Sequence, residues 1–123
     1  MNKIFYPLVF LFMILTSCTY NNEEDLYPNN ICDTSNVTYS QVVKPIFEQY
    51  CYSCHSSATP GTYYGNLNLE NFNHIKREVD NGNLLRNIKH EPGGSPMPQG
   101  ATKLSYCNIL KIENWINQGI PNN

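Results

Sequence analysis

The chain has 123 residues, of which 41% are hydrophobic, 15% are charged and five are cysteine. Since a typical domain contains ~100–150 residues, this length allows one small domain. Eight Lys and Arg residues against ten Asp and Glu residues give a formal net charge of −2. With no cationic excess to neutralise phosphates, we expect no nucleic-acid partner. The negative mean hydropathy excludes a protein built from several membrane spans.

The N-terminal segment, MNKIFYPLVFLFMILTSC, has the composition of an export signal. One positive charge, at Lys3, precedes an apolar run over residues 4–15. The run is too short for a bilayer span, which needs ~20 residues, but it suits the apolar region of a cleaved signal. A buried core helix is the alternative, and Pro7 argues against it because proline disrupts a helix interior.

The letters LTSC at residues 15–18 resemble the lipobox of bacterial lipoproteins. The resemblance implies a signal peptide of residues 1–17 and lipidation of Cys18, whose acyl chains would anchor the protein to a bacterial membrane. We therefore expect localisation in the cell envelope, on the periplasmic or cell-surface side. An ordinary secretory signal is the alternative. Residues 18–30 are polar and acidic, which predicts a flexible tether before a folded domain of residues 31–123.

The first helix is expected over residues 40–50, with Ser40 as N-cap, because apolar side chains recur there at helical spacing. Pro45 lies inside this segment, so the helix starts there or its first turn is distorted. Two more helices are expected over residues 67–81 and 83–89, the first of them ended by an Asn-Gly pair.

Directly after the first expected helix, the letters CYSCH at residues 51–55 form the C-x-x-C-H pattern of c-type haem attachment. The thiols of Cys51 and Cys54 would add across the two vinyl groups of one porphyrin, and the two intervening residues set their separation. His55 would then lie beneath the iron as its proximal ligand. The export signal supports this interpretation, because haem is attached to such motifs outside the cytoplasm. We expect one covalent haem c.

Three other chemistries use similar cysteine spacing. A thioredoxin-like redox pair needs a helix that starts at the first cysteine in a βαβ context, and no strand pattern precedes Cys51. A zinc site needs a second ligand pair, and Cys32 and Cys107 are too scattered to supply it. A plain disulfide would leave His55 without a role.

Cys32 and Cys107 remain as a pair once haem and lipid have taken the other cysteines. In a compartment that permits oxidation we expect a disulfide between them, which would tie the segment before the first helix to the last helix. Two independent thiols are the alternative.

Met97 is the one methionine that remains after the signal peptide, and it lies in the stretch GGSPMPQG at residues 93–100. Prolines on both sides fix extended backbone, and the glycines allow tight turns. A soft thioether presented from such a loop suits a second ligand to haem iron. His74 and His90 are the rival ligands, and a methionine that only fills a gap in a surface loop is the remaining alternative.

The last helix is the clearest of the expected elements. Ser105 is its expected N-cap, and Gly119 followed by Pro121 should end it. Its buried stripe is expected to consist of four large apolar residues: Ile109, Ile112, Trp115 and Ile116. Because no alternating pattern predicts a strand anywhere, the expected fold class is all-α.

This order of helix, C-x-x-C-H motif, variable helices, Pro-Met-Pro loop and amphipathic C-terminal helix resembles class I (mono-haem) cytochrome c. The stretches VVKPIFEQYCYSCH and KLSYCNILKIENWINQGIPNN look especially like the planctomycete-type cytochrome c-like modules of exported bacterial proteins. The similarity covers about residues 31–123. It implies a helical domain wrapped around one haem, with thioethers at Cys51 and Cys54 and iron ligands His55 and Met97.

The resemblance also implies contact between the first and last helices, where a Cys32–Cys107 bridge would fit. The departure lies in the loop SSATPGTYYGN at residues 56–66, which matches no pattern of the family. Tyr63 or Tyr64 as a propionate partner is one interpretation, and exposed loop tyrosines are the other.

These features predict a mono-haem c-type cytochrome that carries single electrons in the cell envelope and is not an enzyme. Its expected partners are redox proteins of the envelope and the membrane that holds the lipid anchor. Two alternatives stay open: a five-coordinate haem protein that binds gas or peroxide, and a haem-free, disulfide-linked surface lipoprotein.

Overall fold

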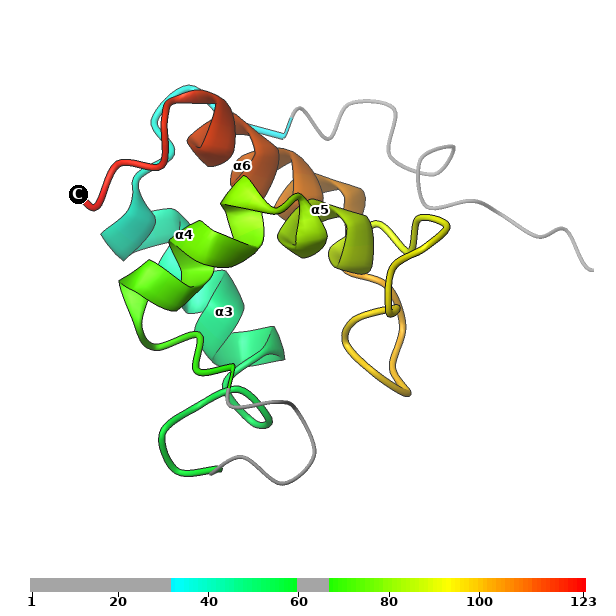
Figure 1. The fold of residues 1–123 in the computed structure, drawn as a ribbon. Coiled ribbons are helices and arrows are strands. Elements are labelled where there is room, and N and C mark those ends of the chain that lie inside the picture. The colour runs from blue at the N-terminus through cyan, green and yellow to red at the C-terminus, as the bar shows by residue number, and fades with distance from the viewer. Residues whose placement is uncertain (1–31, 60–66) are drawn as a thin grey trace, which may run out of the picture. The chain divides into compact units, whose positions relative to one another are not determined.

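The computed structural model describes residues 32–59 and 67–123, which fold into helices joined by turns and loops (Figure 1). Within these ranges there is no strand, so the described part is all-helical as predicted. The predictions for the signal peptide, for lipidated Cys18 and for the tether at residues 18–30 lie outside the described residues. No helix in the described part is long and apolar enough to span a bilayer.

Residues Cys32–Asn123 form one compact unit. Its elements in chain order are the π-helix η1 (Tyr39–Val43) and the α-helices α3 (Lys44–Tyr50), α4 (Phe72–Asp80), α5 (Asn83–Ile88) and α6 (Tyr106–Asn117). The π-helix contacts α3 and α6, and α5 contacts both α4 and α6. The first and last helical segments therefore meet, although most of the chain separates them in sequence.

Pro45 explains why the first helix begins with a π turn. Proline has no N–H to donate and its ring crowds the carbonyl four residues earlier, so a regular α-turn is disfavoured there. The N–H of Lys44 instead reaches back five residues to the carbonyl of Tyr39, which widens the turn. The predicted N-cap, Ser40, was wrong: Thr38 caps this end, and its hydroxyl accepts the Gln41 N–H at 3.3 Å.

The second helix begins later than predicted, at Phe72. Two asparagines hold the preceding residues in turns: Asn68 accepts the N–H of Glu70 through its side chain, and Asn71 caps α4 by accepting the N–H of Asn73. Asparagine favours such local side-chain bonds over a helical conformation. The residues before α4 are therefore available to contact the C-x-x-C-H segment.

Both remaining helices match the predictions closely. Gly82, with a φ of +71°, separates α4 from α5, a backbone conformation that glycine adopts without strain. Ser105 caps α6 by accepting the N–H of Asn108 at 3.2 Å. The chain leaves α6 through Gly119, whose φ is +89°.

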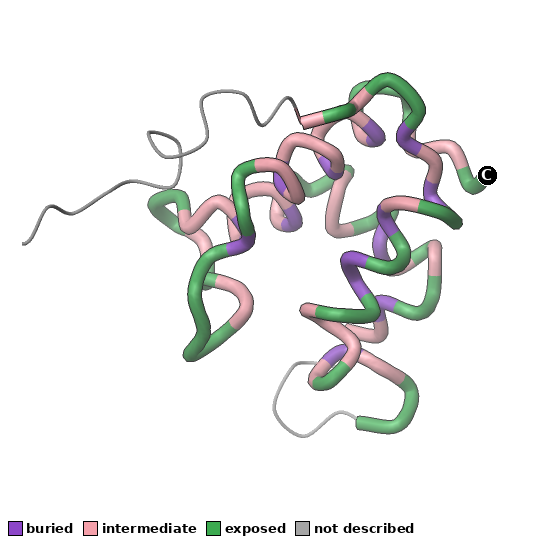
Figure 2. Tube along the Cα trace, turned by 180° about the vertical axis from the view of Figure 1, so that it is seen from behind, coloured by how far each residue is buried: buried purple, intermediate pink, exposed green. Residues whose placement is uncertain are grey.

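The core lies between η1 and the helices α3, α4, α5 and α6, each of which contributes at least one buried residue among more exposed ones (Figure 2). Trp115 and Ile112 of α6 are fully buried, which confirms them as core residues, whereas Ile116 is only half-buried. The Tyr39 ring stacks on Trp115 with centroids 5.6 Å apart, and Phe72 meets both rings edge-on. Such aromatic pairs stabilise a core beyond their area of burial.

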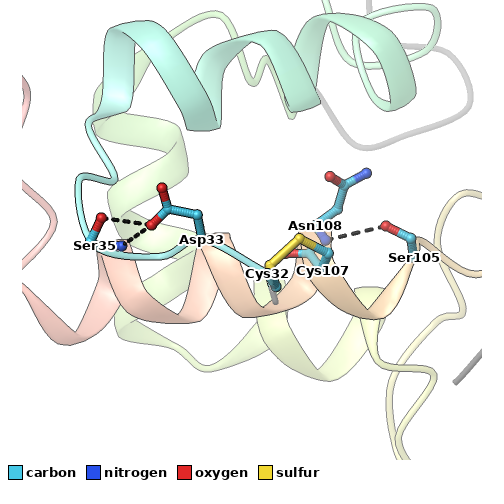
Figure 3. Close-up of a disulfide and its surroundings, with 6 residues drawn as sticks. All are labelled: Cys32, Asp33, Ser35, Ser105, Cys107 and Asn108. Atoms are coloured by element: carbon cyan, nitrogen blue, oxygen red, sulfur yellow. Dashed lines mark hydrogen bonds between the residues drawn. A yellow bond between two sulfur atoms is a disulfide. The ribbon is translucent and has the colours of Figure 1, made fainter. Parts of the chain in front are cut away.

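A disulfide joins Cys32 to Cys107, which confirms the predicted pair (Figure 3). Cys107 lies in the first turn of α6, close to the Ser105 cap. The bond connects residues 75 positions apart. It holds the segment before η1 against the helix that forms much of the core.

Candidate functional site

The C-x-x-C-H motif lies in a tight turn that begins where α3 ends. Cys51 closes α3, and its N–H donates to the Phe47 carbonyl at 2.8 Å. Its own carbonyl then accepts two N–H groups, from Cys54 at 3.1 Å and from His55 at 2.8 Å. The chain therefore folds back on itself, and these hydrogen bonds tie the motif to the end of α3, whose Ile46 and Phe47 are buried in the core.

His55 is held from two sides by the residues that precede α4. It is only 9% exposed, and its carbonyl accepts the N–H of Leu69 at 2.8 Å. Its ring atom Nδ1 lies 3.2 Å from the carbonyl of Leu67. A carbonyl only accepts, so this contact assigns the proton to Nδ1 and the basic lone pair to Nε2. A backbone carbonyl on one ring nitrogen is the arrangement that orients metal-ligating histidines.

The two thiols of the motif are not bonded to each other. Burial, with a smaller contribution from the neighbouring Cys54, raises the pKa of the Cys51 thiol to about 12. Reactive dithiols have the opposite environment, with a lowered pKa at a helix N-terminus, whereas Cys51 lies at a C-terminus, where the helix dipole disfavours a thiolate. This environment argues against the thioredoxin-like alternative.

A cavity of about 320 Å³ opens beside the motif, within the ~300–1,000 Å³ typical of ligand sites. Cys51, Cys54 and His55 line it together with Met97, so the structure brings all four predicted haem-site residues to one cavity. Four buried leucine and isoleucine residues of the core also line it: Leu69, Leu84, Ile88 and Leu104. The cavity therefore continues the hydrophobic core, as a site for a large apolar group would.

Met97 enters the site from the loop that follows α5, and Figure 1 shows this loop and the turn after α3 as separate projections. The rival histidines are engaged elsewhere. His74 accepts the N–H of Asn68 at 3.3 Å through Nδ1, and His90 contacts the Met97 carbonyl at 3.0 Å through Nε2. Of the described residues that line the cavity, none is His74 or His90.

The donor set fits a covalently held haem. The two thiols of the motif, with two residues between them, match the two vinyl groups of a haem. The imidazole is held through Nδ1, so its other ring nitrogen, Nε2, is the one suited to bind iron. The thioether comes from a different loop and lines the same cavity. The apolar walls suit a porphyrin face. Within residues 32–59 and 67–123, no three His, Cys, Asp or Glu side chains gather closely enough to hold a metal ion by themselves, those of the C-x-x-C-H motif included.

Two contributors to the site leave no signal in the sequence. Leu67 acts through its backbone carbonyl, which every residue has, and Asn87 lines the cavity from the last turn of α5. Met97 and the C-x-x-C-H motif were identifiable because their predicted roles depend on side-chain atoms, which the sequence names directly. Tyr63 and Tyr64, considered as propionate partners, lie outside the described residues.

Comparison of the chain with models of known protein families, with characterised proteins and with solved structures finds no match.

Proposed function

We propose that this chain is a mono-haem c-type cytochrome that carries single electrons in the bacterial cell envelope. The observation that supports it most directly is that the C-x-x-C-H residues and Met97, which lie far apart in sequence, line one apolar cavity. A signal peptide, lipidated Cys18 and a tether of residues 18–30 complete the proposal, with anchoring to a membrane and redox proteins of the envelope as partners.

Each side chain has a defined part in holding the cofactor. Cys51 and Cys54 would hold the haem through two thioether bonds, each formed by adding a thiol S–H across one vinyl double bond, so that nothing leaves. His55 would supply Nε2 as an iron ligand, and Met97 its thioether sulfur. When bound, haem supplies an iron that accepts and releases one electron.

The surrounding residues set how readily that electron is held. Leu69, Leu84, Ile88 and Leu104 give the cavity apolar walls, which would bury a bound haem and lower the local dielectric around it. Both this burial and the thioether of Met97 disfavour the additional positive charge of the oxidised form, so both raise the reduction potential. The hydrogen bond from His55 Nδ1 to a backbone carbonyl is weaker than one to a carboxylate and does not oppose this effect strongly.

The first experiment tests covalent attachment. The full chain is produced in a bacterial host that exports it and matures c-type cytochromes, and a denaturing gel is stained for protein-bound haem. We expect a stained band for the wild type and none for the Cys51→Ser/Cys54→Ser double variant. The matched control is Cys32→Ala/Cys107→Ala, which removes two other cysteines and should keep the stain. An unstained wild type, or a mass of peptide and lipid alone, favours the haem-free lipoprotein.

The second experiment tests the sixth ligand. The oxidised protein should show the weak near-infrared band of sulfur-to-iron charge transfer, and Met97→Ala should abolish it while the haem stain remains. The reduced wild type should bind carbon monoxide slowly and the variant rapidly, since the methionine no longer occupies the position. A wild type that lacks the band and binds carbon monoxide rapidly would favour the five-coordinate alternative that binds gas or peroxide.

A further inference from the structure

Both backbone polar groups of Met97 are bonded to residues at the end of α5. The N–H of Met97 donates to the backbone carbonyl of Asn87 at 3.1 Å. Its carbonyl accepts from Nε2 of His90 at 3.0 Å, which assigns the proton of that imidazole to Nε2. The peptide units on either side of the methionine side chain are therefore fixed to one short stretch of chain.

Asn87 makes a second bond to the same loop through its side chain. Its Oδ1 accepts the N–H of Ser95 at 2.9 Å. Gly94 packs closely here, since a Cβ at that position would lie 2.8 Å from Asn87 Oδ1 and 2.9 Å from Cγ of Arg86. The loop thus lies directly against α5. Asn87 binds it at two points: its side chain accepts the N–H of Ser95, and its backbone carbonyl accepts the N–H of Met97.

The support for these contacts is itself rigid. Leu84 and Ile88 of α5 are 6% and 3% exposed, and both belong to the core. Asn87 lines the same cavity as Met97. His90 follows α5 with a φ of +57°, a left-handed conformation that turns the chain from the helix toward the loop. Because α5 is packed into the core, Asn87 and His90 have defined positions. Their hydrogen bonds hold the Met97 backbone in a defined position as well.

We propose that Asn87 and His90 are positioning residues that hold Met97 at the cavity that His55 also lines, so that its sulfur would stay bound to the iron. This inference rests on the proposed function. Glycines at positions 93, 94 and 100 would otherwise let the loop take many conformations, and ordering it would oppose ligation. Neither residue touches the iron; each acts through the methionine backbone or its loop.

The test compares alanine variants with matched variants that keep the hydrogen-bonding atom. Asn87→Ala removes the acceptor of the Ser95 N–H, and Asn87→Asp retains an oxygen there. His90→Ala removes the donor to the Met97 carbonyl. His90→Gln retains a side-chain N–H donor, and both variants keep a Cβ at this left-handed backbone position. All are made in the full chain with its haem attached.

The oxidised protein is titrated with imidazole, which competes with the methionine for the iron. Binding is measured as the loss of the near-infrared band. Each alanine variant should bind imidazole about fivefold more tightly than the wild type, as expected for one lost hydrogen bond of typical strength. The double alanine variant should bind it about 25-fold more tightly if the two effects add. The aspartate and glutamine variants should stay within twofold of the wild type.

The outcomes separate this inference from the proposed function. A wild type without covalent haem or without the band overturns the proposed function, and with it the positioning role of Asn87 and His90. A wild type with both, whose alanine variants bind imidazole as weakly as it does, overturns only the positioning role. Equal changes in the alanine and matched variants also overturn it, since a merely structural role would not distinguish them. Met97→Ala, in which imidazole meets no competing sulfur, sets the upper limit of the expected change.

Discussion

Removal of the Cys32–Cys107 disulfide should lower the free energy of unfolding by about 4.5 kcal/mol, the chain-entropy value for a loop of 75 residues. The loss is large because small domains have a total stability of only ~5–15 kcal/mol. Haem attachment would not replace the bond, because the Cys51 and Cys54 thioethers close a loop of two intervening residues. In the unfolded chain, the ends joined by the disulfide would still be separated by most of the domain.

The measurement is urea unfolding followed by far-ultraviolet circular dichroism, with the wild type compared to Cys32→Ala/Cys107→Ala. The midpoint should fall, and the free-energy difference follows from it with a common slope if both unfold in two states. A reductant, which leaves thioethers intact, should bring the wild type to the stability of the double variant. The double variant should not respond to the reductant.

A stability loss below about 1 kcal/mol in both the double variant and the reduced wild type would refute this reasoning. It would mean that the unfolded chain already holds these segments together, or that the bond opposes native contacts. A loss in the variant alone, without one on reduction, would attribute the effect to the substituted side chains. The disulfide would then not be the source of stability at this end of α6.

The same titration checks three predictions on α6. Ser105→Ala should lower stability by about 1 kcal/mol because it removes the N-cap, and Ser105→Asp, which keeps a capping oxygen, should restore most of it; equal losses would contradict the capping role. Ile112→Ala should cost ~2–5 kcal/mol, since the residue is fully buried, whereas Tyr106→Ala, at a position 61% exposed, should stay within ~0.5 kcal/mol. Trp115→Phe should lose about 1 kcal/mol or more because Nε1 no longer donates to the Pro121 carbonyl, and an unchanged midpoint would contradict this.

The sequence by itself determined those features that depend on a side chain's own chemistry or on local periodicity. The apolar face of α6 depends only on residues near in sequence, since a helix places residues three and four apart on one face. The same holds for its N-cap, since the Ser105 hydroxyl reaches an N–H of the first turn. The disulfide could be predicted because Cys32 and Cys107 were the cysteines that remained. The C-x-x-C-H motif fixes which atoms are available to a haem, although the haem itself stays a prediction.

The tertiary structure decided what depends on contacts between distant segments. Ser40 looked like a cap because it precedes an apolar period, but Pro45 widens the turn and transfers the cap to Thr38. The start of α4 was misplaced because Leu69 fits the apolar period of the helix, whereas the backbone groups of Leu67 and Leu69 contact His55 from the segment before the helix.

The clearest case is the loop that carries Met97. Its prolines and glycines show only that it is neither helix nor strand, because a sequence pattern contains no information about which backbone group another residue will reach. Packing of α5 into the core brings Asn87 and His90 to the methionine backbone and places it at the cavity that His55 also lines. The sequence names the candidate ligands, and only the folded chain, which satisfies its buried polar groups and apolar surfaces together, brings them to one site.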